Sequence, residues 1–228
     1  MSKEITNLNK YFKNLENFKL PNYEEFPPIE LYMEQVVGYI SNGLKDFYGN
    51  NENIITPFMV NNYVKAKIIN PPNDKKYNRE HIAYLVAISL LKSVVPMRDI
   101  ATFIDLDKNL TNNVSSNRNL YDFFKEIQEE TLHQELHKSK IRLDVLSKTN
   151  HKKTDKQHSE EEIEKLNLSY IALRLYIQSE TTKQIADAIM KEVSSSTLPK
   201  DLLEETRREV ALTNRKVLKE AKKVGNRK

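Results

Sequence analysis

The sequence has no cysteine and only four glycines among its 228 residues. Without cysteine it has no disulfide, no thiolate metal site and no thiol nucleophile. The scarcity of glycine argues against the tight glycine-rich loops that hold phosphate groups in nucleotide-binding enzymes. We also find no nucleophile elbow and no recognisable pair of catalytic carboxylates. We therefore expect that the protein is not an enzyme and binds no cofactor.

Long apolar runs are also missing. The longest weakly polar to apolar run extends from Ile82 to Leu91 and ends at Lys92, well short of the roughly 20 residues needed to cross a bilayer. The N-terminal segment MSKEITNLNKYF lacks the apolar core of a secretion signal. We expect no membrane association and a cytoplasmic location.

Charged residues are abundant, at 30% of the chain, and the net charge is +4. Together with many Leu, Lys, Glu and Ile residues, this composition favours an all-α, mainly helical fold. The charge is uneven, because residues 207–228 hold nine basic and two acidic side chains whereas residues 1–50 are slightly acidic. Such a basic end is compatible with a polyanionic partner, and equally with a solvated terminus.

Proline positions and apolar spacing divide the chain into three parts. Residues 1–29 close with LPNYEEFPPIE and are predicted to form an N-terminal arm with one short helix. Residues 30–106 form a compact unit, and residues 107–228 a C-terminal helical region. Apolar spacings of three and four predict helices at these places: 30–47, from Pro57 onward, 79–95, 97–106, 120–146, 160–193 and 202–224.

The segment from Ile55 to Leu85 carries the clearest local signals. Thr56 followed by Pro57 is typical of a helix N-cap and first helical position. Pro71 and Pro72 stop that helix, and the polar, basic NDKKYN that follows suits a short hairpin. Asn78 is then predicted to cap the next helix.

The helix that begins at Pro57 has two different faces. A helical projection at 100° per residue places the residues on two opposite faces. One face carries Met59, Val60, Tyr63 and Val64, and the other carries Phe58, Asn61, Asn62 and Lys65. An asparagine amide can pair with an adenine edge, a phenylalanine can pack on a thymine methyl, and a lysine can neutralise phosphate. The polar face therefore suits DNA. The alternative is an ordinary polar surface with Phe58 covered by the N-terminal arm.

The order of predicted elements is that of a winged helix-turn-helix, in which a hairpin, the wing, follows the DNA-reading helix. The runs MVNNYVKAKIINPP and KKYNREHIAYLVAISLLKSVVPMRDIATFI resemble the DNA-binding domain of MerR regulators. Asn61 stands where MerR proteins generally have arginine, and Lys67 where they have glycine. The residues at matching places are Tyr63, Ile68, Ile69, Pro71, Lys76, Tyr77, Asp99 and Ile100.

A closer resemblance is to an uncharacterised family of Gram-positive bacteria, known as a domain of unknown function and usually described as MerR-like transcriptional regulators. It rests on LPNYEEFPPIELYMEQV, MVNNYV and KKYNREHIAYL, and covers residues 20–106. The polar face and this resemblance together predict that the helix from Pro57 to Lys67 and the wing from Asn73 to Tyr77 contact double-stranded DNA. The predicted DNA-binding residues are Thr56, Phe58, Asn61, Asn62, Tyr63, Lys65, Lys67, Lys75, Lys76, Tyr77 and Arg79. The alternative is a protein-interaction module of helix-turn-helix shape that does not bind DNA.

The C-terminal region is expected to supply the oligomer contact, because MerR-like proteins dimerise through a long helix that follows the DNA-binding module. A homodimer through these helices is the prediction, and a monomeric helical bundle the alternative. The apolar stripe in question is Leu166, Ile171, Leu175, Ile185, Ile189 and Val193.

Two further features of this region suggest ligands only weakly. The aromatic residues Phe123, Phe124, Tyr170 and Tyr176 can line a cavity for an unknown small-molecule effector, although core packing explains them equally. His133 and His137 have the i, i+4 spacing that can hold a metal. No glutamate completes a metalloprotease motif around them, so we expect a solvated pair and no metal site.

Overall fold

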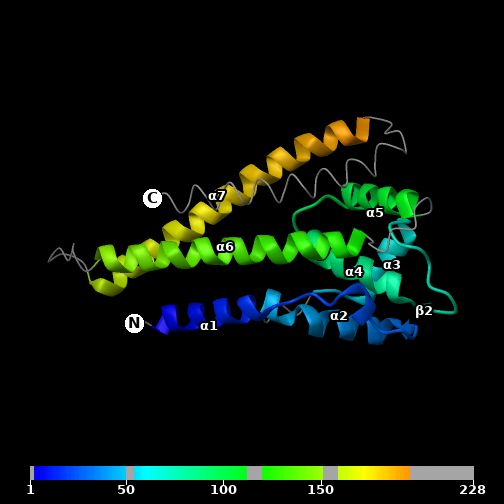
Figure 1. Ribbon diagram of the computed structural model, residues 1–228, viewed down its shortest axis with the longest axis horizontal. Coiled ribbons are helices and arrows are strands. Elements are labelled where there is room, and N and C mark those ends of the chain that lie inside the picture. Colours follow the sequence, from blue (N-terminus) through cyan, green and yellow to red (C-terminus); the bar gives the residue numbers. More distant parts are fainter. Residues whose placement is uncertain (1–2, 50–53, 112–119, 151–158, 196–228) are drawn as a thin grey trace.

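The computed structural model describes residues 3–49, 54–111, 120–150 and 159–195. As predicted, the structure is mainly helical. It also contains one small two-stranded sheet, which was not predicted. Two long antiparallel helices, α6 and α7, form an elongated hairpin, and the remaining elements gather along α6 and around one of its ends (Figure 1). The predicted helix 202–224 lies outside the described residues. Within the described part, no helix is both long and apolar enough to span a bilayer.

The elements follow the predicted order, with some shifted boundaries. Leu31 and Tyr32 form a strand, so the helix expected from residue 30 begins at Met33. The helix expected at residues 97–106 extends to Thr111. In chain order the elements are α1 (Lys3–Asn17), the 3-10 helix η1 (Tyr23–Glu25), β1 (Leu31–Tyr32), α2 (Met33–Tyr48), α3 (Pro57–Lys65), β2 (Lys76–Tyr77), α4 (Arg79–Leu91), α5 (Met97–Thr111), α6 (Leu120–Asn150) and α7 (Glu160–Ser195).

Helix α4 lies at the centre of the core. Ile82, Leu85 and Ile88 are fully buried, and most of its other residues are buried as well. A helix that is apolar on all sides requires cover on all sides. That cover comes from α2, α5, α6 and β2, which all contact α4. The compact unit and the start of the C-terminal region therefore share one core.

The N-terminal segment joins the same core. Helix α1 is longer than the short helix expected there, and it packs on α2 and α6. Phe26 is fully buried. The backbone N–H of Leu20 donates to Glu129 Oε1 at 3.0 Å, and the Tyr121 hydroxyl donates to the Pro21 carbonyl at 3.0 Å. Both bonds attach the predicted arm to α6, while the division into three functional parts stays a prediction.

The basic segment before α4 forms a tight turn, as the sequence predicted. Asn73 and Lys76 exchange backbone hydrogen bonds of 3.1 and 2.8 Å, and both residues between them have positive φ, 45° at Asp74 and 62° at Lys75. Two central residues with positive φ are the mark of a type I′ hairpin turn. The strand that leaves this turn, β2, pairs antiparallel with β1, with Leu31 opposite Tyr77.

Helix α3 ends in a Schellman motif. The backbone N–H of Ile68 donates to the Tyr63 carbonyl at 2.9 Å, and that of Lys67 donates to the Val64 carbonyl at 3.0 Å. The motif requires a left-handed residue just after the helix, usually glycine. Lys67 takes this conformation, with φ of 58°. The backbone thus has the shape that usually takes a glycine, although a lysine stands here.

We expect Lys67→Gly to stabilise the fold by about 0.5–1 kcal/mol. Relief of the left-handed conformation gains about 1–2 kcal/mol, and the greater freedom of glycine in the unfolded chain offsets about 0.5–1 kcal/mol. Urea denaturation measures the change. Lys65→Gly is the matched control. Lys65 is the last residue of α3, where there is no left-handed conformation to relieve, and glycine should cost up to about 1 kcal/mol. A destabilised Lys67→Gly variant would contradict the assigned backbone.

Candidate nucleic-acid interface

The start of α3 is fixed by the predicted cap. The Thr56 hydroxyl accepts a hydrogen bond from the backbone N–H of Met59 at 3.3 Å, and Pro57 occupies the first helical position. The cap satisfies one of the free N–H groups that every helix start leaves open. Because Thr56 performs this structural role, its hydroxyl positions α3.

The two faces of α3 are as the helical projection predicted. Val60 and Tyr63 are buried, whereas Asn61, Asn62 and Lys65 are exposed. Phe58 is 74% exposed, which contradicts the alternative in which the N-terminal arm covers it. One side of the helix thus presents two amides, an aromatic ring and a lysine to solvent.

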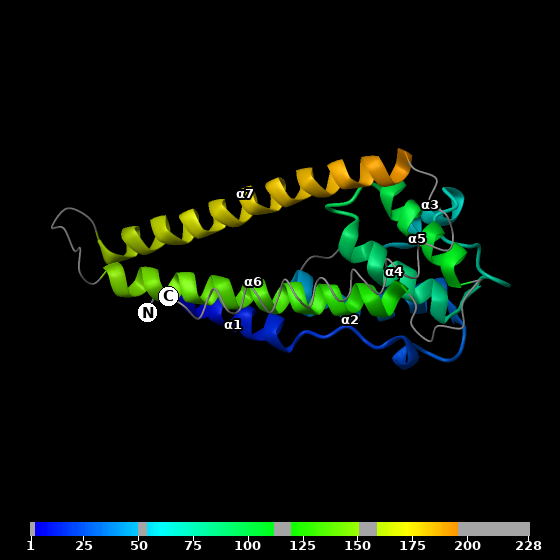
Figure 2. The ribbon, with the colours of Figure 1, turned by 45° about the horizontal axis from the view of Figure 1, so that its top comes forward.

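The basic turn lies at the same end of the molecule as α3 (Figures 1 and 2). Lys75, at the tip, is exposed, and so is Lys67 just after α3. Lys76 is only partly exposed, and its ammonium group lies 5.5 Å from the centre of the Tyr32 ring. Within this cluster Lys65, Lys67 and Lys75 present positive charge most openly.

Two predicted contact residues belong to the core instead. Tyr63 is 8% exposed and Tyr77 is 2% exposed. Burial raises the pKa of both phenols above the ordinary value, so the neutral form is retained. Neither tyrosine therefore belongs to the exposed part of the candidate surface.

The side chain of Arg79, also a predicted DNA contact, binds the N-terminal segment instead. Its Nη1 lies 2.7 Å from Glu24 Oε2, and its guanidinium lies 5.7 Å from the centre of the Tyr23 ring. These contacts offset its charge and direct it toward the segment before β1. Its main role in this arrangement is to hold that segment against α4.

The link between the basic turn and α4 is a reciprocal cap. Asn78 Oδ1 accepts from the backbone N–H of His81 at 3.1 Å, and His81 Nδ1 accepts from that of Asn78 at 3.2 Å. His81 Nδ1 also lies 2.6 Å from Asn78 Oδ1, and Nε2 lies 3.2 Å from the Asn70 carbonyl oxygen. The predicted cap is confirmed, and His81 also ties α4 to the segment after α3.

Lys92 helps to position α3, a role that was not predicted from the sequence. Its Nζ donates to the Ile54 carbonyl at 2.5 Å and lies 3.4 Å from Met59 Sδ. Burial lowers the pKa of its ammonium group below the ordinary value. Lys92 thereby ties the end of α4 to the residues that lead into α3. A lysine directly after an apolar run was the only available signal.

The four aromatic residues considered for an effector cavity do not come together. Tyr170 and Tyr176 are 60% and 76% exposed on α7. Phe123 and Phe124 line a separate apolar cavity of about 220 Å³ between α4, α5 and α6. His133 and His137 are both exposed, and among the described residues no three metal-binding side chains cluster.

Comparisons with known proteins identify part of the chain. Residues 21–127 match the model of a family described as Domain of unknown function (DUF1836). The matched segment runs from η1 into the first turns of α6, so it contains α3, the basic turn and α4. Searches of curated proteins and of solved structures each found no match.

Proposed function

We propose that this protein is a DNA-binding transcriptional regulator that reads double-stranded DNA with α3 and the adjacent basic turn. The supporting observation is the outward orientation of the amide pair, Asn61 and Asn62, on a helix whose other face is buried. The order of α2, α3, hairpin turn, α4 and α5 is that of a MerR-like winged helix-turn-helix, which is part of the proposal.

The chemistry of this surface divides into two tasks. Asn61 and Asn62 can each pair bidentately with an adenine edge, and Phe58 can pack on a thymine methyl. Lys65, Lys67 and the lysines of the turn supply phosphate contacts, which fix the orientation of the helix on DNA. An α-helix with its side chains is about 10–12 Å across, which fits a major groove about 12 Å wide.

Asn61→Ala should weaken binding to the preferred DNA site by about 1–3 kcal/mol and leave binding to random DNA almost unchanged. Selection from random DNA first supplies that site, and fluorescence anisotropy measures both affinities. Asn42→Ala removes an exposed amide from α2 and should change neither. Equal losses of Asn61→Ala on both DNAs would exclude Asn61 from base reading.

Lys65→Gln should make binding less dependent on salt. Each phosphate contact contributes about 0.9 to the slope of log K against log salt concentration, so its loss lowers the slope by about that amount. Measuring the DNA affinity of the variant and of the wild type at several salt concentrations between about 50 and 200 mM tests this prediction. Lys191→Gln, which removes an exposed charge from α7, is the matched control. Absence of any measurable DNA affinity in wild type would favour the protein-interaction module.

We also propose that the protein is a homodimer through its C-terminal helices. Of the predicted stripe, Ile171 is buried on the side of α7 that faces α6, while Ile185 and Ile189 are 57% and 59% exposed. A second stripe is exposed at spacings of four, three and four, the pattern of a helix that packs against a partner helix. It consists of Leu166, Tyr170, Leu173 and Ile177.

The double substitution Leu173→Glu with Ile177→Glu should convert the dimer to a monomer, because each charge would be buried at the contact. Light scattering after size exclusion measures the mass. Ala172→Glu with Ser179→Glu adds the same charge at exposed positions on another side of α7 and should leave the dimer intact. A monomeric wild type at micromolar concentration would contradict this arrangement.

A further inference from the structure

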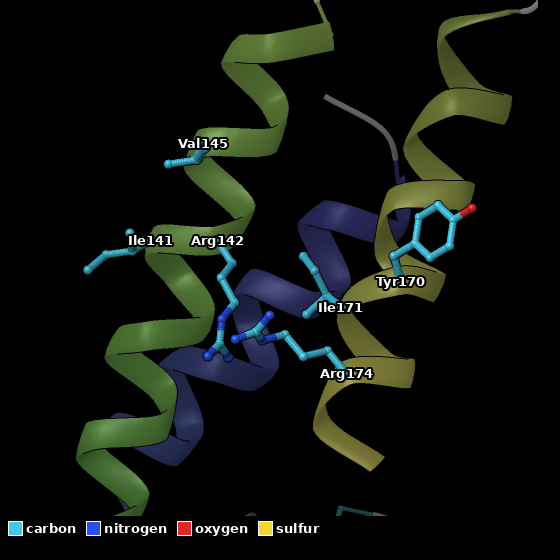
Figure 3. Close-up of a pocket in the computed structure, with 6 residues that line it drawn as sticks. All are labelled: Ile141, Arg142, Val145, Tyr170, Ile171 and Arg174. Atoms are coloured by element: carbon cyan, nitrogen blue, oxygen red, sulfur yellow. The ribbon is translucent and has the colours of Figure 1, made fainter. Parts of the chain in front are cut away.

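A pocket between α6 and α7 lies outside the residues that match the family model. It is an open groove of about 440 Å³, and Ile141, Val145 and Tyr170 at its edges are each more than half exposed. It is separate from the candidate DNA surface, because Arg142 follows Tyr121 by 21 residues along α6, a distance of about 30 Å. The lining residues are Ile141, Arg142, Val145, Tyr170, Ile171 and Arg174 (Figure 3).

Two arginines converge in this pocket. Arg142 extends from α6 and Arg174 from α7, and their guanidinium groups point toward each other (Figure 3). Arg142 Nη1 is buried and has no hydrogen-bond partner among the described residues. No ion pair involves either arginine in that part of the chain. A buried donor without a partner costs free energy, and facing like charges add to the cost.

A third donor lies on the same side of α7. Asn167 Nδ2 is also buried and without a hydrogen-bond partner within the described ranges. Asn167, Ile171 and Arg174 follow each other at spacings of four and three, so they share one face of the helix. Two unpartnered buried nitrogens, together with two guanidinium groups that have no ion pair among the described residues, favour the same kind of complement, an anionic oxygen acceptor.

The rest of the lining is largely apolar. Ile141, Val145 and Ile171 contribute aliphatic side chains, and Tyr170 contributes an aromatic ring. Inorganic anions are strongly hydrated and gain nothing from such walls. A ligand with both an anionic head and an apolar body matches both parts of the lining.

We propose that this pocket binds a small molecule that carries one carboxylate and an apolar chain or ring. The planar guanidinium groups present paired N–H donors that match the two oxygens of a carboxylate, while the apolar body lies against the aliphatic and aromatic walls. This assignment is independent of DNA binding, because it concerns a different surface and a different ligand. It shares Tyr170 with the stripe of the proposed dimer contact.

Octanoate tests the assignment against two matched compounds, 1-octanol with the same chain and no charge, and acetate with the charge and almost no chain. In calorimetric titrations of the full chain at low salt, octanoate should bind saturably with one site per chain. The other two should bind at least about 10-fold more weakly. Absence of saturable octanoate binding, or equal binding of octanol, would overturn the proposal.

Arg142→Met and Arg174→Met should each weaken octanoate binding about 10-fold or more, since each removes charge-assisted hydrogen bonds and retains a long side chain. Lys191→Met removes one exposed charge from α7 and should leave the affinity unchanged. Without ligand, both arginine variants should melt at or above the wild-type temperature, because facing like charges are relieved. Unchanged affinity, or a lower melting temperature without ligand, would show that the arginines have a structural role instead.

Discussion

The burial of α4 on all sides is the constraint on which the arrangement of the molecule depends. Because no face of this helix tolerates water, α2, α5, α6 and β2 must all pack around it. Its two ends then fix the segments that flank α3. His81 at the start binds the carbonyl of Asn70, and Lys92 after the end binds that of Ile54. The orientation of α3 is thus set from both sides.

Local rules were sufficient to predict much of the candidate interface from the sequence. The cap at Thr56, the cap at Asn78 and the exposed face with Asn61 all depend on residues within one or two helical turns. The type I′ turn is local as well, although the sequence did not specify that Asp74 and Lys75 would both have positive φ. Short-range chemistry leaves little freedom at such positions.

The side-chain positions that could not be predicted from the sequence are those that depend on contacts between distant residues. Arg79 pairs with Glu24, 55 residues earlier, and this contact withdraws a predicted DNA-binding side chain from the open surface. Tyr77 is buried because β2 pairs with β1, an association without a local signal. The facing arginines, Arg142 and Arg174, come from two helices, and they meet only because α6 and α7 pack against each other. In each case the role of the side chain can be recognised only when the residue that it contacts is known.

The unbroken length of α6 has a geometric consequence. One end of the helix is anchored in the core through Tyr121, whereas Arg142 lies about 30 Å along the same rod. A tilt of one degree about the anchored end displaces the far end by about 0.5 Å at this length. Any change in the angle at which α6 leaves the core therefore moves the region around Arg142 much more than the anchored end.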